Sequence, residues 1–363
     1  MSERKQTLNV AMIGSGFMGD AHSNAFCQVS RFFKVPFDLH RKVICARDRV
    51  RLEATATRWG WEEVETDWRA VVSRPDIHVV DVAVPNALHA PIAIAVAQAG
   101  KIVLCEKPLA MSLEEAERMA EAARGVPNLV WFNYRRVPAV AFAKQLVDEG
   151  RLGRTFHYRA VYLNPSGTNS TKTKAWRYRR ADAGSGASGD LLSHSIDLAI
   201  HLNGPITELV AMSHTFEPER DVDDATAFLA RFANGSIGTL EASRFGVGHR
   251  NRNAFEINAD GGMLRFNLED MNRLEYYNAK DEPNVQGARN ILVTGPNQPY
   301  AENFWKPGHP IGYEHTFIAT LGDFLGALSR QEAFHPNFDD AVAVQRVLDA
   351  AERSAASRTW VAL

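Results

Sequence analysis

Residues 8–19 read Leu-Asn-Val-Ala-Met-Ile-Gly-Ser-Gly-Phe-Met-Gly, and this stretch decides the fold class. The first six residues form a short apolar run that predicts a buried strand. Gly14, Gly16 and Gly19 follow in the pattern G-x-G-x-x-G, and a helix pattern begins at Met18. The pattern alone is weak evidence. Between a strand and a helix, however, it is typical of a turn that binds the pyrophosphate of a dinucleotide.

A separate role is predicted for each of the three glycines in the turn at residues 14–19. The first permits the tight turn, the second lets a pyrophosphate approach the backbone, and the third lets helix and strand pack closely. The amino end of the helix faces the phosphates. The alternative is a plain glycine-rich connection between strand and helix. The candidate cofactor-binding residues in the glycine turn are Gly14, Gly16, Phe17, Met18 and Gly19.

The rest of the first 136 residues continues to alternate strand and helix patterns. This alternation predicts βαβ units, and therefore an α/β, doubly wound parallel sheet of the Rossmann type over residues 1–136. The expected strands are 8–13, 41–45, 79–84, 102–105 and 129–132, and the expected helices are 18–29, 48–59, 91–99 and 113–124.

The residue pattern changes in residues 137–363, where several strand-like runs follow one another. This pattern predicts an α+β domain with a large, mostly antiparallel open sheet. Asn234-Gly235 is a strong hairpin signal, with a positive φ expected at both positions. Residues 260–262 form a second such turn. The segment 164–188 is expected to be a long loop. The expected strands are 156–163, 208–216, 225–232, 236–243, 254–259 and 263–267, and the expected helices are 139–148, 190–202, 313–328 and 339–357. The late helices could pack back on the first domain.

Composition excludes several classes of protein. The 363 residues are 45% apolar, and 41 Lys+Arg against 43 Asp+Glu leave a net charge of −2, so no electrostatic footprint for nucleic acid or an anionic membrane is present. No apolar run reaches the roughly 18 residues of a membrane span. Three cysteines form no C-x-x-C pair, and the amino-terminal segment has no cleavage-site pattern, so a reducing, cytoplasmic location is expected.

The cofactor's identity depends on the end of the second strand. Asp38 lies about 20 positions beyond the glycine turn, but we expect it in the loop before that strand, away from a ribose. The strand-end position is Ala46, which offers no carboxylate to a ribose diol. The next residue, Arg47, could meet a 2′-phosphate or stack on adenine, or simply be solvated. The cofactor is therefore NAD or NADP, with a slight preference expected for NADP.

Three further motifs point to a known family. They are Pro-Asn-Ala-Leu-His at 85–89, Cys-Glu-Lys-Pro-Leu at 105–109 and Gly-Asp-Leu-Leu-Ser-His at 189–194. With the glycine turn, they resemble the glucose–fructose oxidoreductase/inositol dehydrogenase (Gfo/Idh/MocA) family over nearly the whole chain. Finer features resemble its levoglucosan dehydrogenase-like/inositol 2-dehydrogenase-like branch; they are Asn-Tyr-Arg-Arg at 133–136, Tyr162-Leu163, Trp176-Arg177, residues 184–187 and residues 312–314. One departure is Ala46, where members that take NAD often carry an acidic residue.

The candidate catalytic residues are Lys107, Asp190 and His194. Oxidation of a secondary alcohol needs a proton acceptor and a group that stabilises the developing alkoxide. Lys107 suits the second task and His194 the first, while Asp190 can orient the hydroxyl or tune Lys107. The i,i+4 spacing of Asp190 and His194 predicts one helix face. The alternative is that Asp190 caps the helix and His194 is an interior histidine.

The resemblance also implies further cofactor-binding and substrate-binding residues, and it implies that no metal is needed. A polar stripe of His194, Asp197 and His201 could hold zinc, but is more often a buried seam. In the basic run 172–180, we expect Trp176 to pack on a sugar and Arg177 to bond its hydroxyls, whereas Lys172, Lys174 and Arg180 could equally be solvated. Further cofactor-binding candidates are Arg47, Pro85, Asn86, His89, Glu106, Lys107, Trp176 and Arg177. Substrate-binding candidates are Lys107, Tyr134, Arg135, Asn164, Trp176, Arg177, Asp190, His194 and Tyr313.

The predicted function is an NAD(P)-dependent oxidoreductase that moves a hydride between nicotinamide and a secondary alcohol of a sugar, anhydrosugar or inositol. One alternative enzyme holds NAD tightly and oxidises C3 only transiently, during glycoside cleavage or epimerisation. Another is a non-catalytic dinucleotide-binding sensor, which has no evident use for all three catalytic candidates. Apolar residues on both faces of the second domain's strands predict a homodimer or homotetramer through that sheet.

Overall fold

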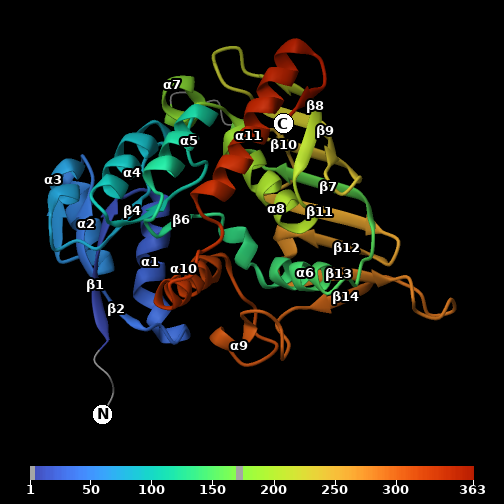
Figure 1. Cartoon of the computed structure of the whole chain (residues 1–363), viewed down its shortest axis with the longest axis horizontal. Helices are drawn as coiled ribbons and strands as arrows, with labels where there is room; N and C mark the ends of the chain where they lie inside the picture. The colour runs from blue at the N-terminus through green and yellow to red at the C-terminus, as the bar shows by residue number, and fades with distance from the viewer. Residues whose placement is uncertain (1–4, 169–174) are drawn as a thin grey trace. The chain divides into compact units, whose positions relative to one another are not determined.

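The computed structural model describes residues 5–168 and 175–363, which form two compact units (Figure 1). The first unit contains residues up to Asn133 together with Tyr313–Val342. The second contains Tyr134–Gly312 and Ala343–Leu363. Among the helices described, none has the length and apolar character needed to cross a membrane.

The first unit is built on a six-stranded sheet in which all strands run parallel, in the order β3-β2-β1-β4-β5-β6. The predicted Rossmann class is thereby confirmed. The strands are β1 (Gln6–Ile13), β2 (Phe37–Cys45), β3 (Glu63–Glu65), β4 (Val79–Val82), β5 (Ile102–Cys105) and β6 (Asn128–Val130). The helices are α1 (Phe17–Phe32), α2 (Arg49–Trp59), α3 (Trp68–Ser73), η1 (Asn86–Leu88), α4 (His89–Gln98), α5 (Leu113–Ala122) and α10 (Tyr313–Arg330). The short η2 (Asn133–Arg136) spans the boundary to the second unit.

Strand β2 starts earlier than the sequence analysis expected. Asp38 therefore lies within β2, opposite Thr7 of β1, and not in the loop before it. That position is still at the amino end of the strand, away from the glycine turn. Phe37-Asp38-Leu39-His40 alternates apolar and polar residues, which is typical of a half-exposed strand, and its exposure alternates too. The expected strand, 41–45, left this alternation out. The short β3 and α3 were also not expected.

Residues from late in the chain complete the first unit. Helix α10 packs against α1, and a Cβ on Gly322 would lie 2.7 Å from the ring of Phe33, so only glycine permits this close approach. Past α10, the backbone N–H of Val130 in β6 donates to the carbonyl of Pro336 at 3.0 Å. This bond covers part of the open edge of β6.

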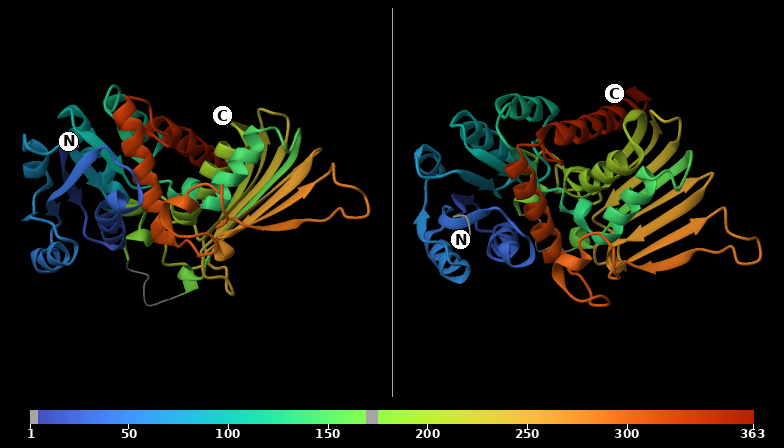
Figure 2. Two further views of the ribbon diagram at one scale, coloured as in Figure 1. Left: turned by 90° about the horizontal axis from the view of Figure 1, so that it is seen from below. Right: turned by 60° about the horizontal axis from the view of Figure 1, so that its bottom comes forward.

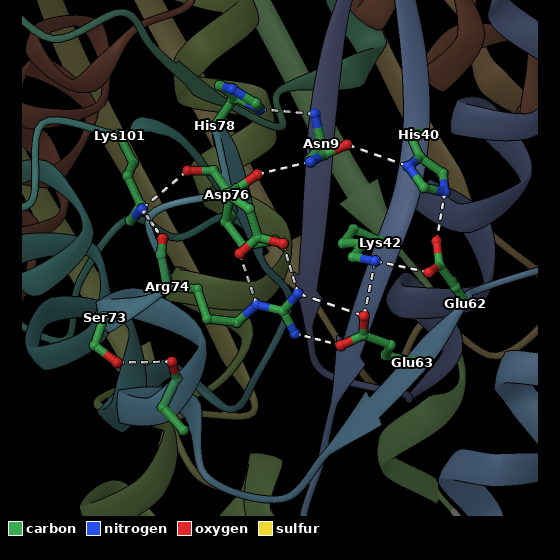
Figure 3. Close-up of polar contacts among 12 residues, drawn as sticks. Asn9, His40, Lys42, Glu62, Glu63, Ser73, Arg74, Asp76, His78 and Lys101 are labelled. Atoms are coloured by element: carbon green, nitrogen blue, oxygen red, sulfur yellow. Dashed lines mark hydrogen bonds and ion pairs between the residues drawn. The ribbon is translucent and has the colours of Figure 1, made fainter.

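At the amino ends of the parallel strands, charged side chains form a polar band (Figure 3). Arg74 pairs with Glu63 and with Asp76, and Lys42 pairs with Glu62 at 2.7 Å and with Glu63 at 2.8 Å. These carboxylates are about four-tenths exposed or more. The remaining members of the band are Asn9, His40, His78 and Lys101.

The second unit is built on a nine-stranded sheet in the order β14-β13-β12-β11-β7-β10-β9-β8-β15. Its strands are β7 (Thr155–Leu163), β8 (Ile206–His214), β9 (Ala225–Phe232), β10 (Ile237–Ser243), β11 (Arg252–Ala259), β12 (Gly262–Asn267), β13 (Arg273–Asn278), β14 (Arg289–Leu292) and β15 (Val361–Ala362). Strands β7 and β10 are parallel, and the other neighbours are antiparallel, as the mostly antiparallel class requires.

Helices α6 (Pro138–Asp148) and α8 (Ser193–Asn203) pack on one face of the sheet, α6 against β12 and β13 and α8 against β7 and β11 (Figure 2). Residues in β9 and β10 alternate between buried and exposed, because successive side chains point to opposite faces. The helices are α6 (Pro138–Asp148), α8 (Ser193–Asn203), α9 (Ala301–Phe304) and the end of α11 (Phe338–Ser357). The predicted loop 164–188 instead contains η3 (Ser166–Thr168), η5 (Trp176–Tyr178) and α7 (Arg180–Ala183), and short η7 (Leu268–Asp270) follows β12.

The hairpin signal at Asn234-Gly235 is confirmed, but its geometry differs from the expectation. Gly235 has a φ of +85°, whereas Asn234 is not among the described residues with a positive φ. The N–H of Gly235 donates to the carbonyl of Phe232, and the N–H of Phe232 donates to that of Ser236. This pattern is a three-residue loop that ends in one left-handed glycine. The Asn234 carboxamide stabilises it by bonding Ser236 and Asn203.

Candidate active site

The glycine turn of the first unit has the shape that a dinucleotide needs. Gly14 has a φ of +124°, and a Cβ there would lie 2.1 Å from the carbonyl oxygen of Ala83. A Cβ on Gly19 would lie 2.4 Å from the carbonyl oxygen of Gly14. A Cβ on Gly16, in contrast, would meet no atom within 4 Å. The first and third glycines are thus required by packing, while the second borders open space.

The start of α1 adds the electrostatic part of this cradle. Gly16 is the N-cap of α1, and no side chain caps the helix there. Helix N-termini attract phosphates through their N–H groups and the helix dipole. Phe17 is 67% exposed, and its ring stacks on Tyr313 with centroids 6.3 Å apart. The residues present therefore fit the pyrophosphate of NAD. Tyr313, a substrate-binding candidate, lies beside this turn.

The loops after β4 and β5 are tied together by His89. Its Nδ1 lies 3.0 Å from the carbonyl oxygen of Pro108, and its Nε2 lies 3.0 Å from that of Val84. The ring is fully buried, and burial lowers its pKa. Pro85 and Asn86, the other candidates here, precede it in the same loop. His89 therefore supports the two loops from inside.

Glu106 and Lys107 follow β5 directly, and the Lys107–Pro108 peptide bond is cis. One carboxylate oxygen of Glu106 accepts the backbone N–H of Lys107 at 3.0 Å. The other lies 3.0 Å from Nε2 of His22, a residue of α1. Glu106 is a cofactor-binding candidate, but these bonds commit its carboxylate to the interior. The lysine's backbone is thereby connected to the helix that the glycine turn opens.

His22 is the centre of a buried cluster that the sequence analysis missed. Its Nδ1 lies 3.0 Å from Asp81 in β4, and the indole N–H of Trp131 donates to the same carboxylate at 2.9 Å. Burial alone would lower the pKa of His22, but the charges and hydrogen bonds of Asp81 and Glu106 outweigh it and raise this pKa to about 9. His22 is thus an imidazolium held between two carboxylates. A lone aspartate inside Val79-Val80-Asp81-Val82 was the available signal, since buried carboxylates need partners.

Asp190 lies in a wide helical turn, and not in the regular helix that was expected. Residues Ser188–Leu192 form a π-helical turn, and α8 begins only at Ser193. The backbone hydrogen bonds of a π-turn run from i to i+5, one residue wider than in an α-helix. No side chain caps this turn, and the side chain of Asp190 is 29% exposed. The reading of Asp190 as a cap is therefore wrong.

His194 lies against two tyrosines of the second unit. Its ring centroid is 4.5 Å from that of Tyr134 and 6.0 Å from that of Tyr162. The hydroxyls of these tyrosines are 3.0 Å apart. Tyr134, a substrate-binding candidate, is therefore brought beside the proposed base.

Arg135 is placed differently from the other substrate-binding candidates. Its guanidinium forms a bidentate ion pair with Asp197, with Nε 3.0 Å from both carboxylate oxygens, and both side chains are buried. This ion pair commits both groups to the interior. Asp197 thus belongs to a buried seam, which also leaves the stripe of His194, Asp197 and His201 with an engaged central carboxylate. Among the described residues, no cluster of metal-ligand type is found.

The remaining candidates occupy the segment before α8 and the end of β2. The guanidinium of Arg177 lies 4.5 Å above the ring of Trp176. Asn164 uses its side-chain oxygen to accept the N–H and hydroxyl of Ser166. Arg47 is exposed just after β2. Lys172 and Lys174 lie outside the described residues.

Comparisons with known proteins agree with this arrangement. Residues 8–134 match an oxidoreductase family with an NAD-binding Rossmann fold, and residues 140–265 match the GFO/IDH/MocA C-terminal domain. A levoglucosan dehydrogenase of Pseudarthrobacter phenanthrenivorans is 40% identical over 98% of both chains. The chain belongs to the GFO/IDH/MocA oxidoreductase family. The resemblance inferred from the motifs is thereby confirmed.

Individual members of the GFO/IDH/MocA family are similar to this chain in sequence and in fold. A solved levoglucosan dehydrogenase in complex with NADH and levoglucosan has a TM-score of 0.96 at 40% identity, covering 99% of both chains. An oxidoreductase domain protein from Kribbella flavida has a TM-score of 0.95 at 43% identity, covering 98% of this chain and 99% of that one. A scyllo-inositol 2-dehydrogenase of Bacillus subtilis is 30% identical over 56% of this chain and 60% of its own. The protein is therefore an NAD-dependent oxidoreductase, which agrees with the predicted NAD(P)-dependent class; the expected preference for NADP is not tested by these relatives.

Proposed function

We propose that the protein oxidises a secondary alcohol of an anhydrosugar or related sugar, with levoglucosan as the first substrate to test. The observation that carries this proposal is the end-to-end similarity to a levoglucosan dehydrogenase, at 40% identity and with 98% of both chains covered. The solved relative with NADH and levoglucosan supports the same substrate class. NAD, when bound, supplies the hydride acceptor.

The chain's own residues supply the remaining chemistry. His194 accepts the proton of the substrate hydroxyl, because an imidazole near neutral pH is suited to general-base work. The Lys107 ammonium stabilises the developing alkoxide as a point charge. Asp190 orients the hydroxyl, and the tyrosine beside His194, Tyr134, borders the sugar. Trp176 and Arg177 provide an aromatic face and hydrogen-bond donors for the ring.

The first test is single-turnover hydride transfer with levoglucosan and a panel of sugars and inositols. His194→Ala should slow transfer by roughly a hundred- to ten-thousandfold, and the residual rate should rise with pH as hydroxide replaces the base. A matched control lies on the same helix: His201→Ala should transfer hydride at the parent rate. Equal loss in both variants would mean that His194 is structural, or that the stripe holds a metal.

For the cofactor, we propose that Ala46 and Arg47 admit NADP in addition to NAD. No carboxylate stands at residue 46 to bond a ribose diol or repel a 2′-phosphate, and exposed Arg47 follows it. Steady-state kcat/KM should be at least as high with NADP as with NAD, and Ala46→Asp should shift the ratio toward NAD. A strong preference of the parent protein for NAD would overturn the proposal, leaving Arg47 as a stacking or solvated residue.

We also propose that two or more copies associate through the uncovered face of the nine-stranded sheet. This face carries a shallow hollow of about 430 Å³. Met212, which is 72% exposed, and Leu229, which is 52% exposed, line this hollow, and exposed apolar side chains on an uncovered sheet face favour contact with another copy. Light scattering at micromolar concentration should give a dimer or tetramer. Leu229→Glu should dissociate it, whereas Val247→Glu, at a more exposed loop position, should not.

A further inference from the structure

A buried arginine stands behind the proposed catalytic aspartate. Arg244 follows β10 directly, and its side chain is 2% exposed. Its Nη2 lies 3.1 Å from Oδ2 of Asp190, and its Nη1 donates to the carbonyl oxygen of Arg177 at 3.1 Å. One guanidinium therefore contacts both the π-turn that carries Asp190 and the short helix that carries Trp176 and Arg177.

The backbone of Arg244 is fixed as firmly as its side chain. Its N–H donates to the carbonyl of Asp224 at 2.9 Å, and its own carbonyl accepts the N–H of Gly167 at 2.8 Å. A Cβ on Gly167 would lie 2.9 Å from that carbonyl oxygen, so the two segments touch. The guanidinium also lies 5.2 Å from the ring centroid of Tyr178. Arg244 is thus held from several sides and cannot turn toward solvent.

We propose that Arg244 is a positioning residue for hydride transfer: it fixes the carboxylate of Asp190 and the Trp176–Arg177 segment in one arrangement. This inference rests on the proposed function, because it needs Asp190 to act on the substrate. A planar guanidinium suits the task, since its donors point in fixed directions and can serve a carboxylate and a carbonyl at once. Burying such a charge is costly without partners, and its two hydrogen-bonded partners both belong to the proposed site.

A second buried arginine provides the matched control. Arg220 pairs with Asp224 at 2.6 Å, and both side chains are fully buried. It also donates to the carbonyl of Gly167 at 2.7 Å and lies 4.2 Å from the ring centroid of Tyr178. Arg220 therefore shares an aromatic neighbour and a degree of burial with Arg244. The contacts described for Arg220, however, are with Asp224, Gly167 and Tyr178, none of which is a candidate catalytic or substrate-binding residue.

The experiment compares Arg244→Met, Asp190→Asn, the double variant, Arg244→Lys and Arg220→Met. Thermal unfolding, NADH affinity and single-turnover hydride transfer are measured for each at a temperature well below unfolding. Arg244→Met should slow transfer by about a hundredfold with NADH affinity unchanged, a loss similar to that of one preorganised polar contact. Arg244→Lys should recover part of the rate, because lysine restores the positive charge but not the planar set of hydrogen-bond donors. Arg220→Met should lower the unfolding temperature at least as much, yet its rate should stay well above that of Arg244→Met, because Arg220 reaches Asp190 only through neighbours that it shares with Arg244, such as Asp224 and Gly167.

The double variant decides whether Arg244 acts through Asp190. Groups that act as a unit are strongly non-additive, so Arg244→Met should cost little further rate in the Asp190→Asn background. Multiplied losses, or a rate for Arg244→Met no lower than that of Arg220→Met, would overturn the inference while the proposed function stood. If Asp190→Asn alone left the rate unchanged, the catalytic role of Asp190 would fall, and the inference with it. Should Arg244→Met fail to fold, Arg244→Lys in both backgrounds gives the same comparison.

Discussion

The two ends of the six-stranded parallel sheet use charged residues in opposite ways. At the amino ends, Arg74 and its carboxylate partners are partly exposed and form a band of ion pairs in contact with water (Figure 3). At the carboxyl ends, His22 and Asp81 are fully buried, and Glu106 beside them bonds the backbone of Lys107. Open α/β sheets bind ligands at their carboxyl ends.

The two ends of the sheet differ in how much a charged side chain contributes to stability and to function. Exposed pairs at the amino ends are screened by water and salt, so each contributes little and can be replaced. The buried cluster at the carboxyl ends has no water to replace a lost partner. It also connects the helix of the glycine turn with the loop of the proposed catalytic lysine. We therefore expect function and large energetic effects at one end, and small effects on stability alone at the other.

The largest contrast should come from two lysines, one at each end. Lys107→Ala should lower kcat by on the order of a hundred- to a thousandfold, because the alkoxide then forms without its cation. Lys42→Ala, in the amino-end band, should leave kcat unchanged. Steady-state kinetics with both variants tests this, with NADH binding as evidence of folding. Similar kcat values for the two variants would remove the distinction between the ends.

The next contrast concerns pH and stability. The pKa of His22 is raised from 6.5 to about 9, so the folded state binds this proton more tightly than the unfolded state. Its stabilising contribution, about 3 kcal/mol, is therefore complete below pH 6.5 and lost as pH rises through about 9. Urea unfolding from pH 6 to 10 should show the excess stability of the parent over His22→Gln shrinking in that window. His40→Gln, in the exposed band, serves as control and should show no comparable slope.

A third contrast concerns the cofactor. Gly16→Val places a side chain in space that borders no other atom of the chain, so the protein should fold normally. That space is where a pyrophosphate would approach, so the Kd for NADH should rise by at least about tenfold. Fluorescence titration measures it. An unchanged Kd would mean that the glycine turn does not bind the dinucleotide.

The smallest effect is expected in the exposed band. Arg74→Met should cost less than about 1 kcal/mol of unfolding free energy at neutral pH, and less still in 1 M salt. The hydrogen bond from Arg74 lowers the pKa of Asp76 from 3.8 to about 2. This contribution is present above pH 3.8 and is lost as pH falls toward 2, so parent and variant should converge in acid. A loss of several kcal/mol of unfolding free energy would contradict this prediction, because the polar band would then stabilise the fold as strongly as a buried ion-pair network.

Local patterns predicted most of the fold and part of the site. The glycine turn and the Glu106-Lys107-Pro108 stretch are each contiguous in sequence, and the strand-helix alternation follows the chain order, so each can be recognised from local residues. Arg244 was not predicted, because its link to Asp190 is made by folding across 54 positions. The His22 cluster was not predicted for the same reason, since its members come from α1, from β4 and from the loop after β5. The π-turn around Asp190 has no signature in residue spacing, which is why a regular helix was expected there.

The late return of residues 313–342 to the first unit has a consequence for how the protein is made. When residue 136 has left the ribosome, every strand of the parallel sheet has been synthesised. Helix α10, which covers α1, and Pro336, whose carbonyl accepts a hydrogen bond from β6, have not yet been made. Until about 200 further residues have been synthesised, from 136 to 336, the face of α1 that α10 covers stays exposed. Long-range pairing of this kind slows folding and prolongs exposure to aggregation. A nascent chain stalled in that interval is therefore a natural client for a chaperone, although the finished protein is not.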